Sequence, residues 1–261
     1  MPEMDDAAYE RLAREVRMLL GIDLSLYRRA QVWRRVNGFA LAKGLPGPDA
    51  LVARVRRDAV LRQTFLDMLT INVSEFFRNP EAWDVLAERH LGPILRRQQS
   101  VRIWSAGCSL GYEPFTLAML ALELAPDANL QILATDVDET VLSRARVATY
   151  NEAQMAGVSA VRRSRFFLSK GDKWEIRPEV RALVEFRRHD LLRDPYEQSF
   201  DIIVCRNVVI YFTEGAKLAM YRRFGGALRS GGILFLGATE SILNVNAVGL
   251  ESVGSTFYRR P

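Results

Sequence analysis

A glycine loop followed by a carboxylate is the first feature of this 261-residue chain that could carry chemistry. In "IWSAGCSLGYEPFTLAML", residues 103 to 120, an apolar run ends at Gly107 and a second glycine stands at Gly111. Glu113 then precedes apolar positions at helical spacing. This order predicts a strand, a tight loop and a helix. Because glycine has no Cβ, such a loop lets backbone N–H groups and a helix N-terminus approach a ligand closely, so we expect a ligand site at Gly107.

Polar residues also follow three later predicted strands. Asp136 follows "LQILAT" and Asp190 lies just after "LVEFRR", while Arg206 and Asn207 follow "FDIIVC". In doubly wound sheets the ligand lies beyond the carboxyl ends of the strands, near the point where the strand order reverses. There Asp136 could accept hydrogen bonds from two ribose hydroxyls, and Asp190 could contact an adenine edge. These residues predict a ribose-bearing ligand.

Glu113 distinguishes between two classes of adenosine cofactor. The nicotinamide dinucleotide fingerprint G-x-G-x-x-G brings the backbone to a pyrophosphate, whereas here three residues separate Gly107 from Gly111. A carboxylate repels a pyrophosphate but suits a cationic ammonium. S-adenosylmethionine has an ammonium, a ribose and no phosphate, and the loop contains no Lys or Arg. We therefore favour S-adenosylmethionine over NAD.

Alternating strands and helices in the second part of the chain predict the sheet that must position these residues. Such alternation is typical of an α/β fold with a parallel sheet covered on both faces. Strands are expected at 101–106, 130–135, 183–188, 200–206 and 232–237, with a final pair in "LESVGSTFYRR". Helices are expected at 113–124, 139–148 and 214–229. The connection 151–182 is long enough for a small insertion.

The first seventy residues predict helices only, including one long helix in "DALVARVRRDAVLRQTFLDML". From residue 28 to residue 62, nine Arg or Lys stand against two Asp or Glu. This charge indicates either a solvated helix face or a docking surface for an acidic helix. The candidate docking residues are Arg28 and Arg35, whose spacing of seven places them on one helical face, and Arg54 and Arg57.

Composition excludes several classes of protein. The content of 49% hydrophobic and 26% charged residues is typical of a globular domain. No run of about 18 apolar residues is present, and the acidic start "MPEMDDAAYE" lacks the form of a signal peptide, so we expect a cytoplasmic protein without membrane insertion. With two cysteines, Cys108 and Cys205, and two histidines, we expect neither a disulfide framework nor a metal site. The net charge of +5 leaves nucleic acid, a membrane surface and an acidic protein open as partners.

Five segments resemble, in order, the successive motifs of the CheR family of chemotaxis receptor methyltransferases. They are "TINVSEFFRNP", "IWSAGCSLGYEPFTLAML", "ATDVDETVLSRARVATY", "FDIIVCRNVVIYF" and "GGILFLGATES". The N-terminal "LLGIDLSLYRRAQVWRRVNGFALAKGL" also resembles the helical domain of that family. The resemblance implies a Rossmann-like class I methyltransferase sheet with an all-helical N-terminal domain. The implied regions are a docking domain at 1–72, a linker and helix at 73–90, and a cofactor domain at 91–261 with its insertion at about 151–182.

The resemblance also implies an activity: S-adenosylmethionine-dependent methyl esterification of glutamates on the cytoplasmic helices of chemoreceptors, with S-adenosylhomocysteine as product. Besides Gly107, the implied cofactor contacts are Asn72, Ser74, Arg78, Glu113, Asp136, Asp190, Leu191, Arg206 and Asn207. Ser74 replaces the usual threonine and keeps its hydroxyl, and Tyr112 replaces an acid.

Methyl transfer to a carboxylate needs no general base, because a glutamate with a pKa of about 4.3 is already ionised at neutral pH. We expect Arg78 to meet a carboxylate of the cofactor or substrate. The Tyr211 hydroxyl is expected to line the transfer site, unless Tyr211 is a buried strand-end aromatic. Phe76 and Phe77 are expected to pack in the core and seat Arg78.

Two other function classes remain open: an RNA methyltransferase, and a regulator that binds the cofactor without turnover. Adenine-directed enzymes place an Asn/Asp-Pro-Pro-aromatic element after the fourth strand, and cytosine-directed ones need a cysteine beside proline. This chain has "CRNVVIYF" there, so we expect no nucleic-acid partner. The insertion segment "LSKGDKWEIRP" is short and glycine-poor, which disfavours tethering to a receptor's C-terminal peptide.

Overall fold

The computed structural model describes residues 5–70 and 74–261 and divides into two compact units. The first unit comprises Met1–Asn72 with Ile210–Lys217, and the second comprises Val73–Val209 with Leu218–Pro261. Residues 210–217 were expected in the cofactor domain. They group with the N-terminal helices because Arg28 N donates to the Tyr211 carbonyl at 3.0 Å and Thr213 N donates to the Leu26 carbonyl at 2.9 Å.

The N-terminal part of the first unit is all-helical, as predicted. Its elements are α1 (Asp6–Leu20), the short 3-10 helix η1 (Leu24–Leu26), α2 (Arg29–Ala42), α3 (Pro48–Val55) and α4 (Ala59–Thr70). The prediction of a single helix through residues 49–69 is wrong, because α3 ends at Val55 and α4 begins at Ala59. Leu61 N donates to Asp58 Oδ1 at 2.9 Å, and the Arg62 guanidinium donates to the carbonyls of Val55 and Arg56. A side-chain cap and a satisfied helix end thus replace the continuous helix.

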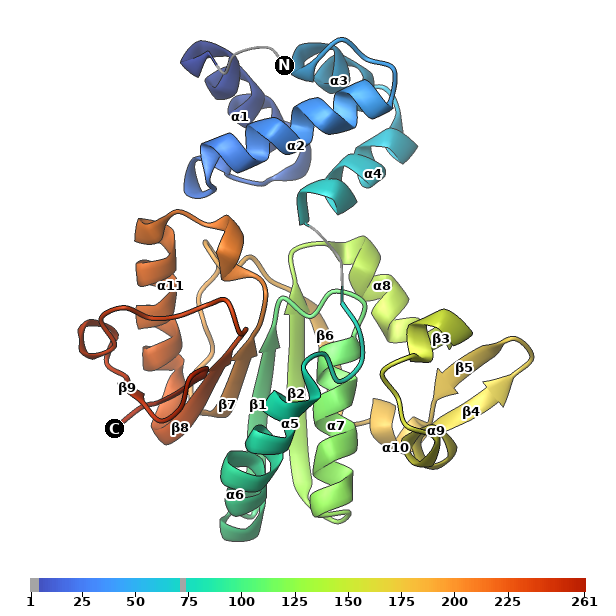
Figure 1. Cartoon of the computed structure of the whole chain (residues 1–261), viewed down its shortest axis with the longest axis vertical. Coiled ribbons are helices and arrows are strands. Elements are labelled where there is room, and N and C mark those ends of the chain that lie inside the picture. Colours follow the sequence, from blue (N-terminus) through green and yellow to red (C-terminus); the bar gives the residue numbers. More distant parts are fainter. Residues whose placement is uncertain (1–4, 71–73) are drawn as a thin grey trace. The chain divides into compact units, whose positions relative to one another are not determined.

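A seven-stranded sheet forms the centre of the second unit, with strand order β6-β2-β1-β7-β8-β10-β9 (Figure 1). Its strands are β1 (Ser100–Ala106), β2 (Asn129–Asp136), β6 (Val184–Arg188), β7 (Phe200–Cys205), β8 (Leu228–Leu236), β9 (Glu251–Ser252) and β10 (Phe257–Arg259). Neighbouring strands in the series β6-β2-β1-β7-β8 pair in parallel. Strand β10 pairs antiparallel with both β8 and β9. The predicted α/β class is confirmed.

Helices cover both faces of this sheet. They are α5 (Pro80–Val85), a π-helical turn (Leu86–Leu91), α6 (Gly92–Arg97), α7 (Tyr112–Leu124), α8 (Glu139–Val147) and α11 (Glu214–Ala227). Two short 3-10 helices, η4 (Val209–Tyr211) and η5 (Asn246–Val248), follow β7 and β8 in the chain. Neighbouring β1 residues face opposite sides: Ile103 shares a buried core with Phe115 of α7, whereas the Trp104 ring lies 5.5 Å from that of Phe224 in α11. In the described part of the chain, no helix combines the length and apolarity needed to cross a bilayer.

The long connection after α8 forms a small antiparallel sheet of its own, of strand order β3-β5-β4 (Figure 1). Its elements are β3 (Thr149–Asn151), η3 (Glu152–Met155), α9 (Ala160–Phe166), β4 (Phe167–Lys170), β5 (Lys173–Ile176) and α10 (Pro178–Arg181). The ring of Phe76 lies 4.8 Å from those of Tyr112 and Tyr150 and 5.6 Å from that of Phe167. Phe76 and Phe77 are therefore core residues, as expected, and Tyr112 belongs to the same aromatic cluster.

Candidate cofactor site

The strand order reverses between β1 and β7. Strands β2 and β6 lie on one side of β1, whereas β7 and β8 lie on its other side. Ser105 of β1 is opposite Val204 of β7, so the chain leaves both strands at the same level, at Gly107 and Arg206. A ligand site in a doubly wound sheet lies outside the carboxyl ends of strands at such a point. The predicted glycine loop and the predicted Arg206–Asn207 pair are thus brought together.

The glycines of the loop are required by the protein's own packing. Gly107 and Gly111 both have φ of 86°, a left-handed conformation that favours glycine. A Cβ at Gly107 would lie 2.5 Å from Val208 Cγ2, and one at Gly111 would lie 3.2 Å from Ala145 and Phe115. Side chains of the protein therefore fill the space that a Cβ would take at these two positions. The close approach of a ligand to the backbone at Gly107 stays a prediction.

Asp136 lies at the end of β2 and is 9% exposed. Its Oδ2 accepts a hydrogen bond from Ser109 N at 2.9 Å, and its Oδ1 accepts one from Asp138 N at 3.1 Å. Burial raises the pKa of Asp136, and these backbone donors oppose that shift. A carboxylate has about four acceptor positions, so its oxygens can also accept from ribose hydroxyls. Asp138 Oδ1 accepts from Thr140 N at 2.8 Å and caps α8.

Glu113 lies in the first turn of α7, where a helix N-terminus favours negative charge. Its Oε1 accepts a hydrogen bond from Ser105 Oγ at 2.7 Å. Burial raises the pKa of Glu113 from 4.5 to about 7, although the positive charge of Arg206 and the Ser105 hydroxyl lower it. A cation placed beside this carboxylate would restore its ionised form near neutral pH.

Arg206 joins the end of β7 to the segment that precedes α5. Its Nη2 donates to the Arg78 carbonyl at 3.0 Å and to Asn79 Oδ1 at 3.1 Å. Its guanidinium lies 5.0 Å from the centre of the Trp83 ring and 4.8 Å from that of Phe235. Burial lowers the pKa of Arg206, which the charge of Glu113 opposes. Arg206 therefore positions the backbone at Arg78, whatever else it binds.

The Asp190–Leu191 segment forms a turn beside β6. Asp190 Oδ1 accepts from Leu192 N at 2.9 Å, and its other oxygen lies 3.9 Å from the Arg193 guanidinium. The Leu191 carbonyl accepts from Tyr196 Oη at 2.7 Å and from Arg223 Nη1 at 2.9 Å. These bonds fix the turn, and a contact of Asp190 with adenine remains a prediction.

Besides Arg78, two of the expected contacts precede α5. Asn72 lies outside the described residues. Ser74 Oγ is buried, and no residue in the described ranges provides it with a hydrogen-bond partner. A buried hydroxyl without a partner is costly, so a polar ligand atom at this position would satisfy it. With the raised pKa of Glu113 and the free acceptor capacity of Asp136, this fits a polar, cationic, ribose-containing cofactor.

Family comparisons agree with this geometry. Residues 72–258 match the family described as "CheR methyltransferase, SAM binding domain", and residues 7–70 match "CheR methyltransferase, all-alpha domain". The chain belongs to the CheR methyltransferase family. It is thus an S-adenosylmethionine-dependent methyltransferase, which confirms the family resemblance and the cofactor prediction.

Individual CheR proteins match over nearly their full lengths. The chain is 42% identical to a "Chemotaxis protein methyltransferase" of Listeria monocytogenes over 251 residues, which is 96% of both chains. It is 36% identical to "Chemotaxis protein methyltransferase 1" of Pseudomonas aeruginosa over 238 residues, 86% of each chain. A relative from Salmonella typhimurium is 31% identical over 93% of this chain and 86% of its own.

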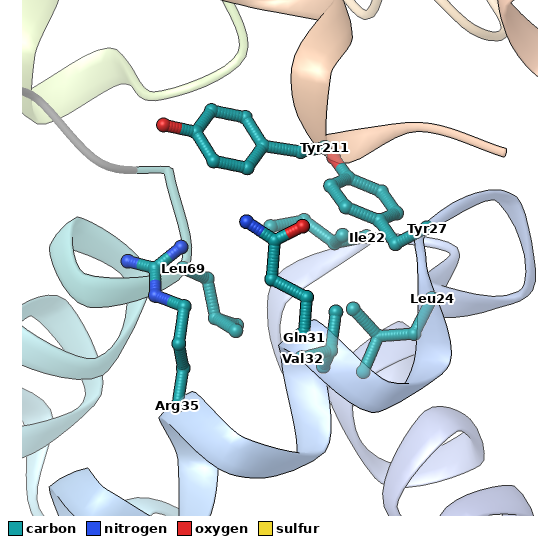
Figure 2. Close-up of a pocket in the computed structure, with 8 residues that line it drawn as sticks. All are labelled: Ile22, Leu24, Tyr27, Gln31, Val32, Arg35, Leu69 and Tyr211. Atoms are coloured by element: carbon teal, nitrogen blue, oxygen red, sulfur yellow. The ribbon is translucent and has the colours of Figure 1, made fainter.

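Tyr211, an expected catalytic residue of this CheR chain, lies in the first unit. It lines a small pocket with seven residues of the N-terminal helical region: Ile22, Leu24, Tyr27, Gln31, Val32, Arg35 and Leu69 (Figure 2). The Arg35 guanidinium lies 5.9 Å from the centre of the Tyr211 ring and donates to the Met68 carbonyl. Tyr27 and Phe212 pack edge to face at 5.1 Å. Arg35 and Tyr27 thus hold the segment that carries Tyr211.

The expected docking arginines fall into two groups. Arg28 pairs with Glu214 at 2.8 Å, and it precedes α2 in an extended conformation. The expectation that Arg28 and Arg35 share a helical face is therefore wrong, and both have partners within the chain. Arg54 and Arg57, in contrast, line an open groove of about 710 Å³. Its other lining residues are Leu45, Ala50, Ala53, Asp58, Ala59 and Val60.

Sequence reasoning missed a buried carboxylate beside the predicted Arg206–Asn207 pair, Glu240, which lies in the loop after β8. It belongs to the quoted segment "GGILFLGATES", but no spacing distinguishes it from an exposed acid. Its only sequence signal is its place just beyond a strand end, where ligand sites of this fold lie.

Proposed function

We propose that this CheR methyltransferase transfers a methyl group from S-adenosylmethionine to glutamate side chains on the cytoplasmic helices of chemoreceptors. Two carboxylates at the carboxyl edge of the sheet carry the proposal: Glu113, which is half-buried, and Asp136, which is buried. They suit a cofactor that has an ammonium and a ribose but no phosphate. The names of the chemotaxis methyltransferases that the chain resembles support the receptor as substrate.

We assign the cofactor contacts by the chemistry of each group. Glu113 binds the ammonium of the methionine moiety, Asp136 binds the ribose hydroxyls, and Asp190 with Leu191 contacts the adenine. Ser74 supplies its buried hydroxyl, and Arg78 binds a carboxylate of the cofactor or the substrate. Asn72, Gly107, Arg206 and Asn207 complete the proposed set.

When bound, S-adenosylmethionine supplies a methyl group activated by a sulfonium. The acceptor glutamate is ionised at neutral pH, so no residue of the chain has to remove a proton. The protein has to hold the carboxylate oxygen in line with the methyl–sulfur bond, at about 3 to 3.5 Å from the methyl carbon, and to limit hydration of the anion. Transfer would form the oxygen–methyl bond and break the methyl–sulfur bond, whose electron pair would stay on sulfur.

The proposed role of Tyr211 is to line the methyl-transfer site with its hydroxyl. Tyr211→Phe keeps the ring beside Arg35 and removes only the hydroxyl. We expect the rate constant of methyl transfer to fall at least tenfold, about 1.4 kcal/mol of transition-state stabilisation, with the Kd for the cofactor unchanged. Single-turnover methylation with saturating cofactor measures this rate constant. An unchanged rate constant in the variant excludes Tyr211 from the chemistry.

The proposed docking surface is the groove that Arg54 and Arg57 line, and its ligand is an acidic receptor helix. Positive charge beside the small apolar residues Ala50, Ala53 and Ala59 suits a helix that presents both carboxylates and apolar side chains. Because these receptor helices are cytoplasmic, the proposed location of the enzyme is the cytoplasm.

The product distinguishes this function from its alternatives. The protein is incubated with S-adenosyl-[methyl-³H]methionine and receptor cytoplasmic fragments, and the labelled product is treated with mild alkali. A glutamate methyl ester releases volatile methanol. Label that stays in added RNA indicates an RNA methyltransferase, and binding of the cofactor without any label indicates a silent regulator. Asp136→Asn is the matched loss-of-binding control, because it keeps the size of the side chain.

A further inference from the structure

Glu240 is a buried carboxylate that holds three backbone N–H groups. It is 4% exposed. Its Oε2 accepts hydrogen bonds from Asn207 N and Gly237 N, both at 2.8 Å, and its Oε1 accepts from Val209 N at 2.9 Å. Hydrogen bonds to a charged acceptor are about twice as strong as neutral ones. The cost of burying this carboxylate is offset by these three donors.

Two of these donors belong to the turn that follows β7. Asn207 has φ of 60°, a left-handed conformation that few residues other than glycine adopt. The carboxylate of Glu240 binds the N–H of Asn207 on one oxygen and that of Val209 on the other, so it spans the turn. Because Cys205 of β7 is opposite Leu236 of β8, Glu240 also ties together the ends of two neighbouring strands.

The position of the Glu240 carboxylate requires glycine at position 237. A Cβ at Gly237 would lie 2.6 Å from Glu240 Oε2 and 3.0 Å from Asn207 N. The φ of Gly237 is not in the left-handed region, so space and not backbone conformation requires the glycine. Any side chain there would displace the carboxylate from the turn.

Arg206, next to Asn207 in the chain, extends this clamp to a second loop. Its guanidinium donates to the Arg78 carbonyl and to Asn79. The negative charges of Glu113 and Glu240 both favour the charged form of Arg206 and oppose the lowering of its pKa by burial. One cation therefore lies in the field of two carboxylates, one from α7 and one from the loop after β8.

We infer that Glu240 is a positioning residue for the cofactor site, which holds Asn207 directly and Arg78 through Arg206. The inference rests on the proposed function, because Asn207, Arg206 and Arg78 are proposed cofactor contacts. Glu240 itself is not assigned a contact with the cofactor.

Calorimetry with S-adenosylhomocysteine, which binds without reacting, tests this role. Glu240→Gln removes the charge and turns an amide NH₂ toward a backbone N–H. We expect its Kd to be at least fivefold weaker than that of the natural protein, measured well below the Tm of each variant. Glu251→Gln, which removes an exposed carboxylate paired with Arg259, is the control and should stay within twofold. A Glu240→Gln variant with a lower Tm but a Kd changed less than fivefold would mean a purely structural residue and overturns the inference.

Gly237→Ala is the second variant, and it decides the question if Glu240→Gln does not fold. It keeps every charge but displaces the carboxylate, so the same fivefold threshold applies. Gly226→Ala is its control, since a Cβ there meets nothing within 4 Å. Failure of the natural protein to bind S-adenosylhomocysteine would refute the proposed cofactor site itself. Binding by the natural protein together with unaffected variants would refute only the role of Glu240.

Discussion

At the scale of single residues, Glu113 has the property that links its position to its proposed task. Burial raises its pKa to about 7, so part of Glu113 is protonated near neutral pH. An ammonium binds only the ionised form well, so binding of the cofactor should release a proton from this residue. The same partial burial should reduce the hydration of the carboxylate and so strengthen its attraction for an ammonium.

We expect the affinity for S-adenosylmethionine to fall as the pH falls below 7. At pH 6, one unit below this pKa, about 90% of Glu113 is protonated, against about a quarter at pH 7.5, so Kd should be about eightfold weaker at pH 6 than at pH 7.5. Calorimetry from pH 6 to pH 7.5, below the pH at which the amino group of the cofactor loses its own proton, measures the dependence. In Glu113→Gln the affinity should be low and nearly independent of pH, and a wild-type Kd that is constant over this range would contradict the assignment.

Asp136 should act through its acceptor capacity. Asp136→Asn replaces one acceptor oxygen by a donor, which then faces the N–H of Ser109 or Asp138. We expect a loss of about 2 to 3 kcal/mol in cofactor binding, since hydrogen bonds to a charged group are lost. Asp172→Asn, an exposed acid in the turn between β4 and β5, is the control and should bind as the natural protein does.

At the scale of elements, short side-chain caps and glycines decide where helices and loops begin. The break between α3 and α4 depends on Asp58 and Arg62, and the loop after β1 depends on Gly107. Neither feature is visible from hydrophobic periodicity, because both depend on a contact that exists only in the folded chain.

Asp58→Ala should destabilise the helical unit by about 1 kcal/mol, because it removes the acceptor for Leu61 N at the start of α4. The lowered stability should be seen as an earlier loss of helical circular dichroism on heating. Asp127→Ala, at an exposed loop position, is the control and should leave the unfolding curve unchanged. An unchanged curve for Asp58→Ala would exclude a capping role.

Gly107→Ala should destabilise the sheet unit by about 1 to 3 kcal/mol, because alanine is strained at φ of 86° and its Cβ meets Val208 at 2.5 Å. The Tm should fall even without cofactor. Gly226→Ala, in the α11 helix, should leave the Tm unchanged or raise it. A Gly107→Ala variant that loses cofactor affinity at an unchanged Tm would instead support a ligand-approach role.

At the scale of the whole molecule, the net charge of +5 and the arginine-rich helices bear on the partner. Attraction between exposed charges is screened over about 8 Å at physiological ionic strength. Docking of an acidic helix on Arg54 and Arg57 should therefore weaken with salt. Arg28 and Arg35 are poor probes, since their reversal would also break contacts within the chain.

Reversal of Arg54 and Arg57 to glutamate should raise the KM for receptor at least fivefold at low salt and leave the cofactor Kd unchanged. Reversal of Arg96 and Arg97, at the exposed end of α6, is the matched control and should change neither value. Receptor methylation is assayed from about 20 to 300 mM salt, a range over which the Debye length shortens and the attraction between exposed charges weakens. Unchanged KM values for the Arg54/Arg57 variant would discard this docking surface.

The sequence alone determined the alternation of strands and helices, the polar residues at the strand ends and the family motifs. These are local patterns of apolar and polar residues, and they can be recognised in the sequence without knowledge of the contacts in the folded chain. The α/β class, the helical N-terminal region and the cofactor were predicted in this way.

Only the tertiary structure decided which partner each side chain takes. It revealed Glu240 under the Asn207 turn, Val208 against Gly107, Glu214 beside Arg28 and Tyr211 among the N-terminal helices. Each of these contacts joins residues that are far apart in the chain but close together in the folded molecule, and hydrogen bonds and packing depend on closeness in space. Periodicity and spacing contain no information on such distances, so these contacts had to be seen in the folded molecule.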